Sequence, residues 1–353
     1  LAPGTLRLTD TPALEGISVQ DQIDAVRALA GRPLREEVYG LDGSEEQGMP
    51  FVIREFSHGL RVLQPRKGRQ AAAVQVLENQ QLDCVIERGA VSFLTKPDTE
   101  RPPQQPRIQH TLALEHDALG FVVRRATVAY GHLQQTSTAQ GRTWVTLEDR
   151  QFHHFTDLPN QFRTGTPTAE QRHSAWAPLP WSGALWDVDN VRKALADATR
   201  TSPGSVPSNA AANQLQLIEA RYFEYWSDSA GTAKPALLGT ASARALLRRE
   251  LRLAFTTDML AATLGVQRLN GIDLSKEGGY VHSQELQPKD PPPSLPSDAW
   301  WAPSPAVTYD RARFLLVKEQ QDPFGNTTSF AFDDHALHLA QVIDPYANTT
   351  VVE

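Results

Sequence analysis

Residues 322–328 read Asp-Pro-Phe-Gly-Asn-Thr-Thr, and residues 344–350 read Asp-Pro-Tyr-Ala-Asn-Thr-Thr. The two stretches form an internal repeat with a period of 22 residues. In a type I turn, proline sets φ at the second position and glycine accepts a positive φ at the fourth. A unit of two short strands cannot bury its own face, so we expect it to stack on neighbours, with further copies in a longer parent chain. The repeat predicts turns, each followed by a strand, at Asp322, Pro323, Gly325 and Asn326 and at Asp344, Pro345 and Asn348.

Strand-like patterns continue upstream of the repeat. Ile108, His110, Leu112 and Leu114 alternate with polar residues, residues 117–120 predict a turn, and residues 122–130 return with one apolar face. Short runs of period two lie at 51–56, 60–63, 74–77 and 84–86, and glycines at 43, 59, 68 and 89 punctuate this stretch. Residues 144–147 and 152–155 are strand-like, 214–226 fits a helix or a strand, and 251–256 predicts a strand that enters a helix.

Helices are expected only at 18–30, at 189–199 and at about 257–264. The first has the clearest signals, because Ser18 is a good N-cap and Ile23, Val26 and Ala30 fall on one helical face. Gly31 and Pro33 then end the segment. Many hairpins and few peripheral helices together predict a mostly β fold, a curved and open antiparallel sheet.

Changes in composition suggest three parts. Residues 1–31 form a lead-in with a helix, residues 32–200 form a β-rich middle region, and residues 209–353 form a β-rich region that ends in the two repeats. The serine- and proline-rich stretch 201–208 divides the last two parts, and residues 288–296 predict a proline-rich surface loop.

Composition excludes several classes of protein. Hydrophobic residues make up 40% of the 353-residue chain and charged residues 21%, which is typical of a folded globular protein. No apolar run reaches the roughly 20 residues that span a bilayer. A net charge of −7 argues against a general nucleic-acid binder. Residues 1–10 lack the pattern of a secretory signal. The single cysteine, Cys84, excludes an internal disulfide framework and a four-thiolate zinc site.

Sequence motifs for catalysis are absent. The chain has no Gly-x-Ser-x-Gly elbow, no phosphate-binding glycine-rich loop with lysine and no His-Glu-x-x-His. No two glutamates lie two residues apart, as the Glu-x-Glu pair of an ADP-ribosyltransferase would require. Cys84 lies in an apolar strand-like run, which favours a buried, inert thiol. We therefore expect no catalytic residue, no cofactor and no metal ion.

A few histidines allow a second interpretation. His335 and His338 could share a metal on a helix, but on the strand predicted there they point to opposite faces. His153 and His154 are neighbours on a presumed strand, which predicts one buried and one exposed ring.

Two further clusters each allow a structural and a binding interpretation. Arg66, Lys67 and Arg69 fit a solvated hairpin tip, or else a patch for an acidic partner. Trp300 and Trp301 fit packing within a β wall, or else stacking on a sugar.

An ordered series of motifs resembles a known family. Singly each motif is weak, but together they follow one order from about residue 24 to the end, with a poor match over 66–105. The series resembles the middle-to-C-terminal region of the B-type subunit of insecticidal toxin complexes (TcB or TcdB, related to SpvB), of the RHS/YD-repeat class. Phe121 departs from this pattern, because the family's turn usually has Asn there. The motifs lie at 31–39, 41–44, 61–65, 106–110, 114–120, 128–131, 251–256, 278–280, 300–304 and 322–326.

The resemblance implies a structural role. In such complexes the B- and C-type subunits form a hollow β-sheet shell around the toxic part of the C-type subunit, and a propeller of the B-type subunit docks to the A-type channel. This chain would then be a non-enzymatic segment of the shell wall, in a secreted bacterial toxin complex, without inserting into a membrane itself. The alternative is a β-rich binding module that recognises a glycan or receptor through Trp300, Trp301 or the loop at 291–293.

Overall fold

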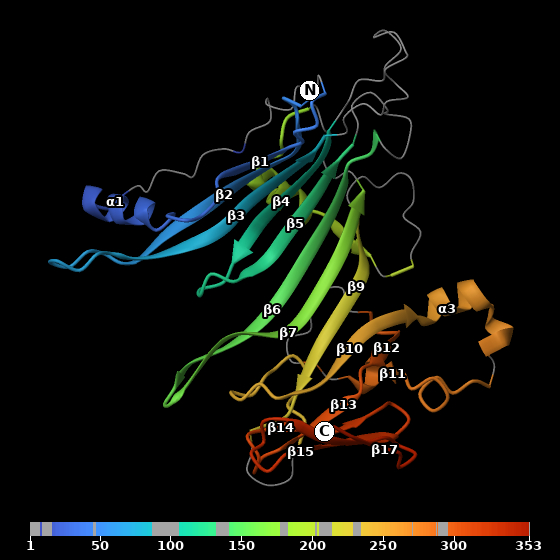
Figure 1. Ribbon diagram of the computed structural model, residues 1–353. Helices are drawn as coiled ribbons and strands as arrows, with labels where there is room; N and C mark the ends of the chain where they lie inside the picture. Colours follow the sequence, from blue (N-terminus) through green and yellow to red (C-terminus); the bar gives the residue numbers. More distant parts are fainter. Residues whose placement is uncertain are drawn as a thin grey trace. The chain divides into compact units, whose positions relative to one another are not determined.

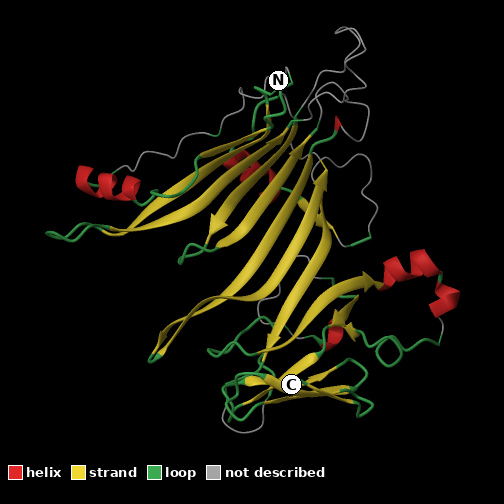
Figure 2. Ribbon diagram, in the orientation of Figure 1, coloured by secondary structure: helices red, strands yellow, loops and turns green. Residues whose placement is uncertain are grey.

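The computed structural model describes residues 8, 16–44, 47–86, 106–131, 141–176, 183–201, 203–204, 214–228, 234–269, 271–286, 288 and 296–352. Within these residues the protein is mostly antiparallel β, in two open sheets, which confirms the predicted fold class (Figures 1 and 2). The predicted loop at 288–296 lies almost wholly outside the described residues.

The larger sheet contains most of the strands. Its members are β1 (Arg35–Tyr39), β2 (Pro50–Gln64), β3 (Ala73–Val85), β4 (Arg107–His116), β5 (Val122–Tyr130), β6 (Trp144–Leu158), β7 (Gln161–Trp176), β8 (Thr199–Thr201), β9 (Gln214–Tyr225), β10 (Leu247–Thr256), β11 (Val281–His282) and β12 (Ala299–Pro303). Hydrogen-bonded neighbours follow the order β1-β2-β3-β4-β5-β6-β7-β9-β10-β12-β11, and β8 pairs with β9.

The smaller sheet is a meander in the order of the chain. It consists of β13 (Ala306–Asp310), β14 (Leu316–Gln321), β15 (Thr327–Phe332), β16 (Leu339–Ile343) and β17 (Thr349–Val351). The helices are α1 (Val19–Arg27), α2 (Val188–Ala196) and α3 (Thr257–Leu264), with short 3-10 turns η4 (Val266–Leu269) and η5 (Ser283–Glu285). All three predicted helices are therefore present. Helices α1 and α2 are shorter than predicted, and α3 has the predicted bounds.

The chain divides into two compact units. The first unit comprises Leu1–Glu148, Ser174–Thr199 and Asn209–Leu215, and the second comprises Asp149–His173, Arg200–Ser208 and Gln216–Glu353. Most of the predicted linker at 201–208 lies outside the described residues, so the domain limits stay a prediction.

The first unit is organised around one apolar face of strands β2–β6. Rows of paired residues cross the strands, and one row joins Ile53, Cys84, Ile108 and Tyr130. Helix α2 adds Val191 and Leu195 to the same buried cluster. The predicted hairpin at 107–130 is thus confirmed, with Ile108 and its alternating neighbours on the buried face.

Four short predicted runs are in fact two long strands. β2 continues through Gly59 and β3 through residues 78–83, so the four runs at 51–86 belong to a single two-stranded ribbon. The register shifts between Ser57 and His58, and a Cβ on Gly59 would lie 2.9 Å from Asn79 Oδ1. Glycine at this point therefore allows the strand to pass close to its neighbour, rather than ending it.

Helix α1 buries its acidic side. Its Ser18 cap accepts a hydrogen bond from the Asp21 amide, as expected, but Ala30 lies beyond the helix and Val26 is exposed. The buried residues include Asp21 and Asp24, which contact the segment that follows β2. The apolar periodicity located the helix correctly but did not mark its packed side.

The second unit has an aromatic core. Tyr222 of β9 and Trp301 of β12 are both buried, with ring centroids 5.4 Å apart, and Leu251 of β10 lies in the same cluster. The ambiguous segment 214–226 is therefore a strand, and the predicted passage from strand into helix at 251–264 is confirmed by β10 and α3.

Side-chain hydrogen bonds seal the first strand of the smaller sheet. Trp226 Nε1 donates to the Val307 carbonyl at 2.6 Å, and the Tyr309 hydroxyl donates to the Leu247 carbonyl at 2.8 Å. The Arg248 guanidinium lies 5.3 Å from the centre of the Trp226 ring, at cation–π distance. These bonds connect β13 with the ends of β9 and β10 inside the second unit.

Candidate functional site

The first repeat turn is held by one carboxylate. Asp322 Oδ1 accepts hydrogen bonds from the Phe324 and Asn326 amides, both at 2.9 Å, and Oδ2 accepts one from Asn326 Nδ2 at 2.8 Å. The Gly325 amide donates to the Asp322 carbonyl at 3.1 Å, and Gly325 has φ 90°. The Asn326 side chain contributes most to holding the pKa of Asp322 below its usual value. The turn is therefore held by an aspartate at its first position and has a residue of positive φ at its fourth.

The second repeat turn reproduces these bonds. Asp344 Oδ1 accepts from the Tyr346 and Asn348 amides at 2.9 and 2.8 Å, and Oδ2 accepts from Asn348 Nδ2 at 2.7 Å. The Asn348 side chain likewise lowers the pKa of Asp344. Ala347 has φ 63°, a left-handed conformation that is unfavourable for alanine. Pro323 and Pro345 occupy the second position of their turns.

A third turn of the same kind joins β4 to β5. Asp117 Oδ1 accepts from the Leu119 and Phe121 amides at 2.8 and 3.0 Å, and Gly120 has φ 88°. Phe121 replaces the asparagine of the repeat turns, so this turn forms without the amide side chain. The departure from the family pattern at Phe121 therefore leaves the backbone of the turn intact.

The first repeat turn also packs on a glycine. Gly279 has φ 68°, and a Cβ built on it would lie 2.8 Å from Pro323 Cβ and 3.3 Å from Phe324 Cζ. A methyl group at this position would collide with the proline ring. Packing against Pro323 in the second unit thus explains the glycine at position 279 of the motif Gly278-Gly279-Tyr280.

The two tryptophans considered for binding differ in exposure. Trp301 is fully buried, and its Nε1 donates to Ser283 Oγ at 3.0 Å. Trp300 is half-buried and makes an edge contact with the His282 ring at 4.7 Å. A sugar could reach Trp301 only if the core opened, and the loop at 291–293 lies outside the described residues.

One residue of the basic cluster, Arg66, pairs with a carboxylate of the same chain. Arg66 donates through Nε and Nη2 to the Asp24 carboxylate at 3.0 and 2.8 Å, and its amide donates to Asp21 Oδ1 at 2.7 Å. The Arg66 guanidinium lowers the pKa of Asp24, and the Arg66 amide lowers the pKa of Asp21. The acidic partner of Arg66 is therefore helix α1, while Lys67 and Arg69 lie at the exposed hairpin tip.

Cys84 and His110 are both buried in the first unit. Burial raises the pKa of the Cys84 thiol to about 11, so the nucleophilic thiolate is scarce at neutral pH. His110 contacts Tyr130 Oη at 3.2 Å and Gln80 Oε1 at 2.9 Å, and burial lowers its pKa to about 4. Both groups are neutral members of the core.

The histidine pairs differ from expectation. His335 and His338 lie in the loop between β15 and β16, not on a strand, because Asp333 turns the chain by accepting from the Leu337 and His338 amides. His153 and His154 are both half-buried; His153 stacks on Phe155 and His154 Nδ1 accepts from the Gly165 amide. Within the described part of the chain, no group of three or more His, Cys, Asp or Glu is arranged to hold a metal.

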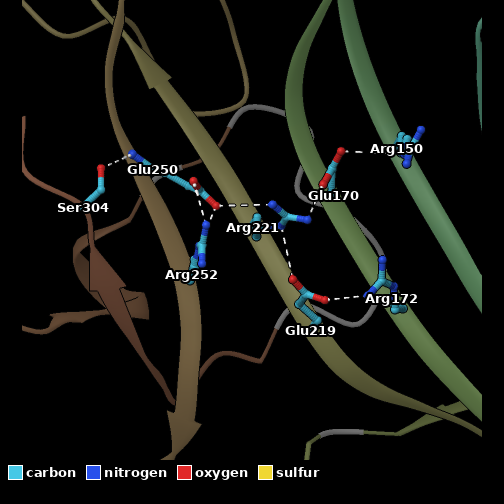
Figure 3. A network of polar contacts seen from close by, with 8 residues as sticks. All are labelled: Arg150, Glu170, Arg172, Glu219, Arg221, Glu250, Arg252 and Ser304. Atoms are coloured by element: carbon cyan, nitrogen blue, oxygen red, sulfur yellow. Dashed lines mark hydrogen bonds and ion pairs between the residues drawn. The ribbon is translucent and has the colours of Figure 1, made fainter. Parts of the chain in front are cut away.

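A ladder of charged residues covers one face of β6, β7, β9 and β10 in the second unit (Figure 3). Arg221 lies at its centre and contacts three carboxylates: Glu170 at 3.1 Å, Glu219 at 3.2 Å and Glu250 at 3.6 Å. We call the seven charged residues of this network the charge ladder; they are Arg150, Glu170, Arg172, Glu219, Arg221, Glu250 and Arg252.

The outer members of the charge ladder are bridged in the same way. Arg150 lies 3.6 Å from Glu170, and Arg172 lies 3.0 Å from Glu219. Arg252 contacts Glu250 at 2.8 Å, and Glu250 raises the pKa of Arg252. Signs alternate along the whole network, so positive and negative charge are nearly balanced.

The charge ladder has a sequence signal that the motif search missed. The sequence contains Glu-x-Arg four times, at 148–150, 170–172, 219–221 and 250–252. Each copy lies on a strand, where residues two apart share a face. The intervening residues Gln171, Ala220 and Leu251 are buried on the opposite face. Because the four strands are neighbours in the sheet, Arg150 of the first motif and both charged residues of the other three combine into one surface.

Residues 24–177 match the family model of the insecticide toxin TcdB middle/C-terminal region. The resemblance drawn from the sequence motifs is thereby confirmed over these residues. No curated protein matches the sequence significantly. None of the helices in the described residues has both the length and the apolar character of a membrane span.

Solved structures show a similar fold over nearly the whole chain. A crystal structure of TcdB2-TccC3-Cdc42 matches with 18% identity and a TM-score of 0.63, over 95% of this chain and 16% of that chain. A crystal structure of TcdB2-TccC3 matches with 20% identity and a TM-score of 0.62, over 95% and 17%. The Tc holotoxin pore of Photorhabdus luminescens matches with 19% identity and a TM-score of 0.62, over 96% and 16%. The chain thus spans about one sixth of the solved chains that it resembles.

Proposed function

We propose that this chain is a wall segment of a toxin-complex shell, which encloses and protects a cytotoxic polypeptide before delivery. The observation that carries the proposal is the likeness of 95% or more of the chain to a stretch of TcdB2, in structures where TcdB2 is complexed with TccC3. The role is structural rather than enzymatic. The turns and the buried aromatic core of the chain stabilise its sheets, and the charge ladder covers one sheet face.

The architecture suits a wall. Successive hairpins extend each sheet strand by strand, and neither sheet closes on itself in the described residues. The first strand of the smaller sheet is sealed by Trp226 and Tyr309, whereas β17 at its other side is exposed. A sheet that is sealed at one edge and open at the other can be continued by further hairpins.

The partners follow from the same proposal. The chain would act with a C-type subunit and its toxic cargo, and with an A-type channel subunit through the rest of its parent chain. Such a complex would be secreted. The net charge of −7 gives no reason to expect a nucleic-acid partner.

Co-expression of the full parent chain with the product of the neighbouring downstream gene tests the proposal. We expect a tight one-to-one complex in which a tail of the partner resists protease that digests the same tail in the isolated partner. A parent chain that stays monomeric, and leaves the partner digestible, would overturn the proposal. Adding the parent chain after the partner has already folded is the matched control, since enclosure requires assembly around the cargo.

A further inference from the structure

The two faces of the sheet region formed by β6, β7, β9 and β10 differ in how far the rest of the chain covers them. One face is closed by the chain itself, because Leu238, Val281 and Leu286 pack against the cluster that contains Tyr222 and Trp301. The other face carries the charge ladder, whose side chains range from 18% exposed at Glu250 to 65% exposed at Arg252. An outside molecule that meets this part of the sheet therefore meets the charge ladder.

We propose that the charge ladder faces the enclosed polypeptide and acts as a weakly adhesive lining; this inference rests on the proposed shell function. An unfolded polypeptide exposes apolar groups and charges of both signs. It adheres to apolar patches and to surfaces of a single charge sign. The charge ladder offers neither, because its guanidinium and carboxylate groups alternate and already bind one another.

The geometry resists binding in a second way. A cargo carboxylate that approaches Arg221 competes with Glu170, Glu219 and Glu250, which are anchored on the same sheet. The exchange replaces one ion pair by another and gains little free energy. The ladder therefore tolerates contact with an unfolded chain and releases it when the shell opens.

Removing carboxylates from the charge ladder tests the weak adhesion. The double variant Glu170→Gln, Glu219→Gln removes the carboxylates that pair with Arg150, Arg172 and Arg221, and so leaves the charge ladder with excess positive charge. The probe is a fluorescein-labelled, unstructured peptide of Glu, Gly and Ser residues, measured by fluorescence anisotropy at low salt. We expect about tenfold tighter binding by the variant, which disappears at high salt.

Glu115→Gln is the matched control for this experiment. It removes one carboxylate from an exposed pair with Arg124 in the first unit, at 3.4 Å, outside any ladder. We expect this variant to bind the peptide as weakly as the wild type. Wild-type protein that binds the peptide as tightly as the double variant would overturn the claim of weak adhesion.

Cysteine labelling tests where the charge ladder faces. Cys84 is buried and has a raised thiol pKa, so Arg252→Cys introduces the reactive thiol of this segment. A maleimide with a long polyethylene glycol chain is applied to the full parent chain, alone and in complex with its partner, and labelling at residue 252 is measured by peptide mass spectrometry. We expect labelling in the isolated parent chain and at least about tenfold slower labelling in the complex. Lys276→Cys, at a side chain that is 85% exposed on a loop, checks that the reagent is active in both samples.

The outcomes separate the two proposals. Slow labelling of residue 252 together with a protected partner tail supports both. Equal labelling of residue 252 in the two samples, with the partner tail still protected, overturns the lining and leaves the shell proposal in place. A digestible partner tail overturns the shell proposal itself.

Discussion

The two repeat turns use the same hydrogen bonds in different surroundings. In each, an aspartate accepts two backbone amides and one asparagine side chain, at distances that differ by no more than 0.1 Å. The first turn, however, packs against Gly279, and its Phe324 is 59% exposed. In the second, Tyr346 is 88% exposed and Ala347 adopts φ 63°.

This difference shows which parts of a turn are local. The aspartate and asparagine bonds need only residues within five positions of one another, so both copies form them. The tolerance for alanine in place of glycine, and the contact with another loop, depend on what surrounds the turn. The comparison therefore predicts that equal substitutions in the two turns have unequal effects.

The largest effect is expected from Gly279→Ala. The substitution adds a left-handed alanine, at about 1 kcal/mol, and a collision with Pro323, at about 1–3 kcal/mol. We expect the free energy of unfolding, measured by denaturant titration, to fall by about 2–4 kcal/mol. Gly271→Ala is the control, because Gly271 has φ 85° with nothing within 4 Å of its Cβ position. Equal losses in the two variants would show that packing on the first turn contributes nothing.

The second-largest loss of stability is expected from Gly325→Ala in the first repeat turn. Its Cβ would meet open space, but φ 90° lies outside the small left-handed region that alanine accepts. We expect a loss of about 1–2 kcal/mol in the free energy of unfolding. An unchanged value would mean that the first turn relaxes toward the geometry already seen at Ala347.

The reverse substitution, Ala347→Gly, should have a smaller effect of opposite sign. Glycine relieves the strain at φ 63°, although it also makes the unfolded chain more flexible. We expect a net gain of about 0.5–1 kcal/mol in the free energy of unfolding. A loss of stability would show that the Ala347 methyl group makes a favourable contact.

The smallest effect is expected from acid. The pKa values of Asp322 and Asp344 are lowered in the folded protein, chiefly by the side chains of Asn326 and Asn348. A lowered folded pKa gives stability that is present above the unfolded value, near pH 4, and is lost as the pH falls through the folded pKa.

Replacing both turn aspartates, as Asp322→Asn with Asp344→Asn, should remove this part of the pH dependence. The melting temperatures of wild type and double variant, compared between about pH 5 and pH 2, should converge as the pH falls. Parallel curves for the two proteins would show that these carboxylates do not stabilise the turns through their charge.

Local patterns predicted much of this molecule correctly. Ser18, the Asp117 turn and the transition at Thr256 are signals that act within a few residues, and each lies where the sequence indicated. The errors had one local and one distant cause. His335 and His338 were assigned to a strand, but Asp333 turns the chain there. The sequence pattern predicted a strand break at Gly59, but the strand continues there and Asn79 of the partner strand fills the space beside Gly59.

The sequence by itself determined the repeat turns, the hairpin at 107–130, the three helices and the family resemblance. These depend on side-chain bonds between near neighbours and on alternation along single strands, which a linear pattern contains. Only the tertiary structure decided that α1 buries Asp24 against Arg66, and that residues from four separate Glu-x-Arg motifs form one charge ladder. Those features depend on strand order and register, which bring residues as far apart as Arg150 and Arg252 onto one face.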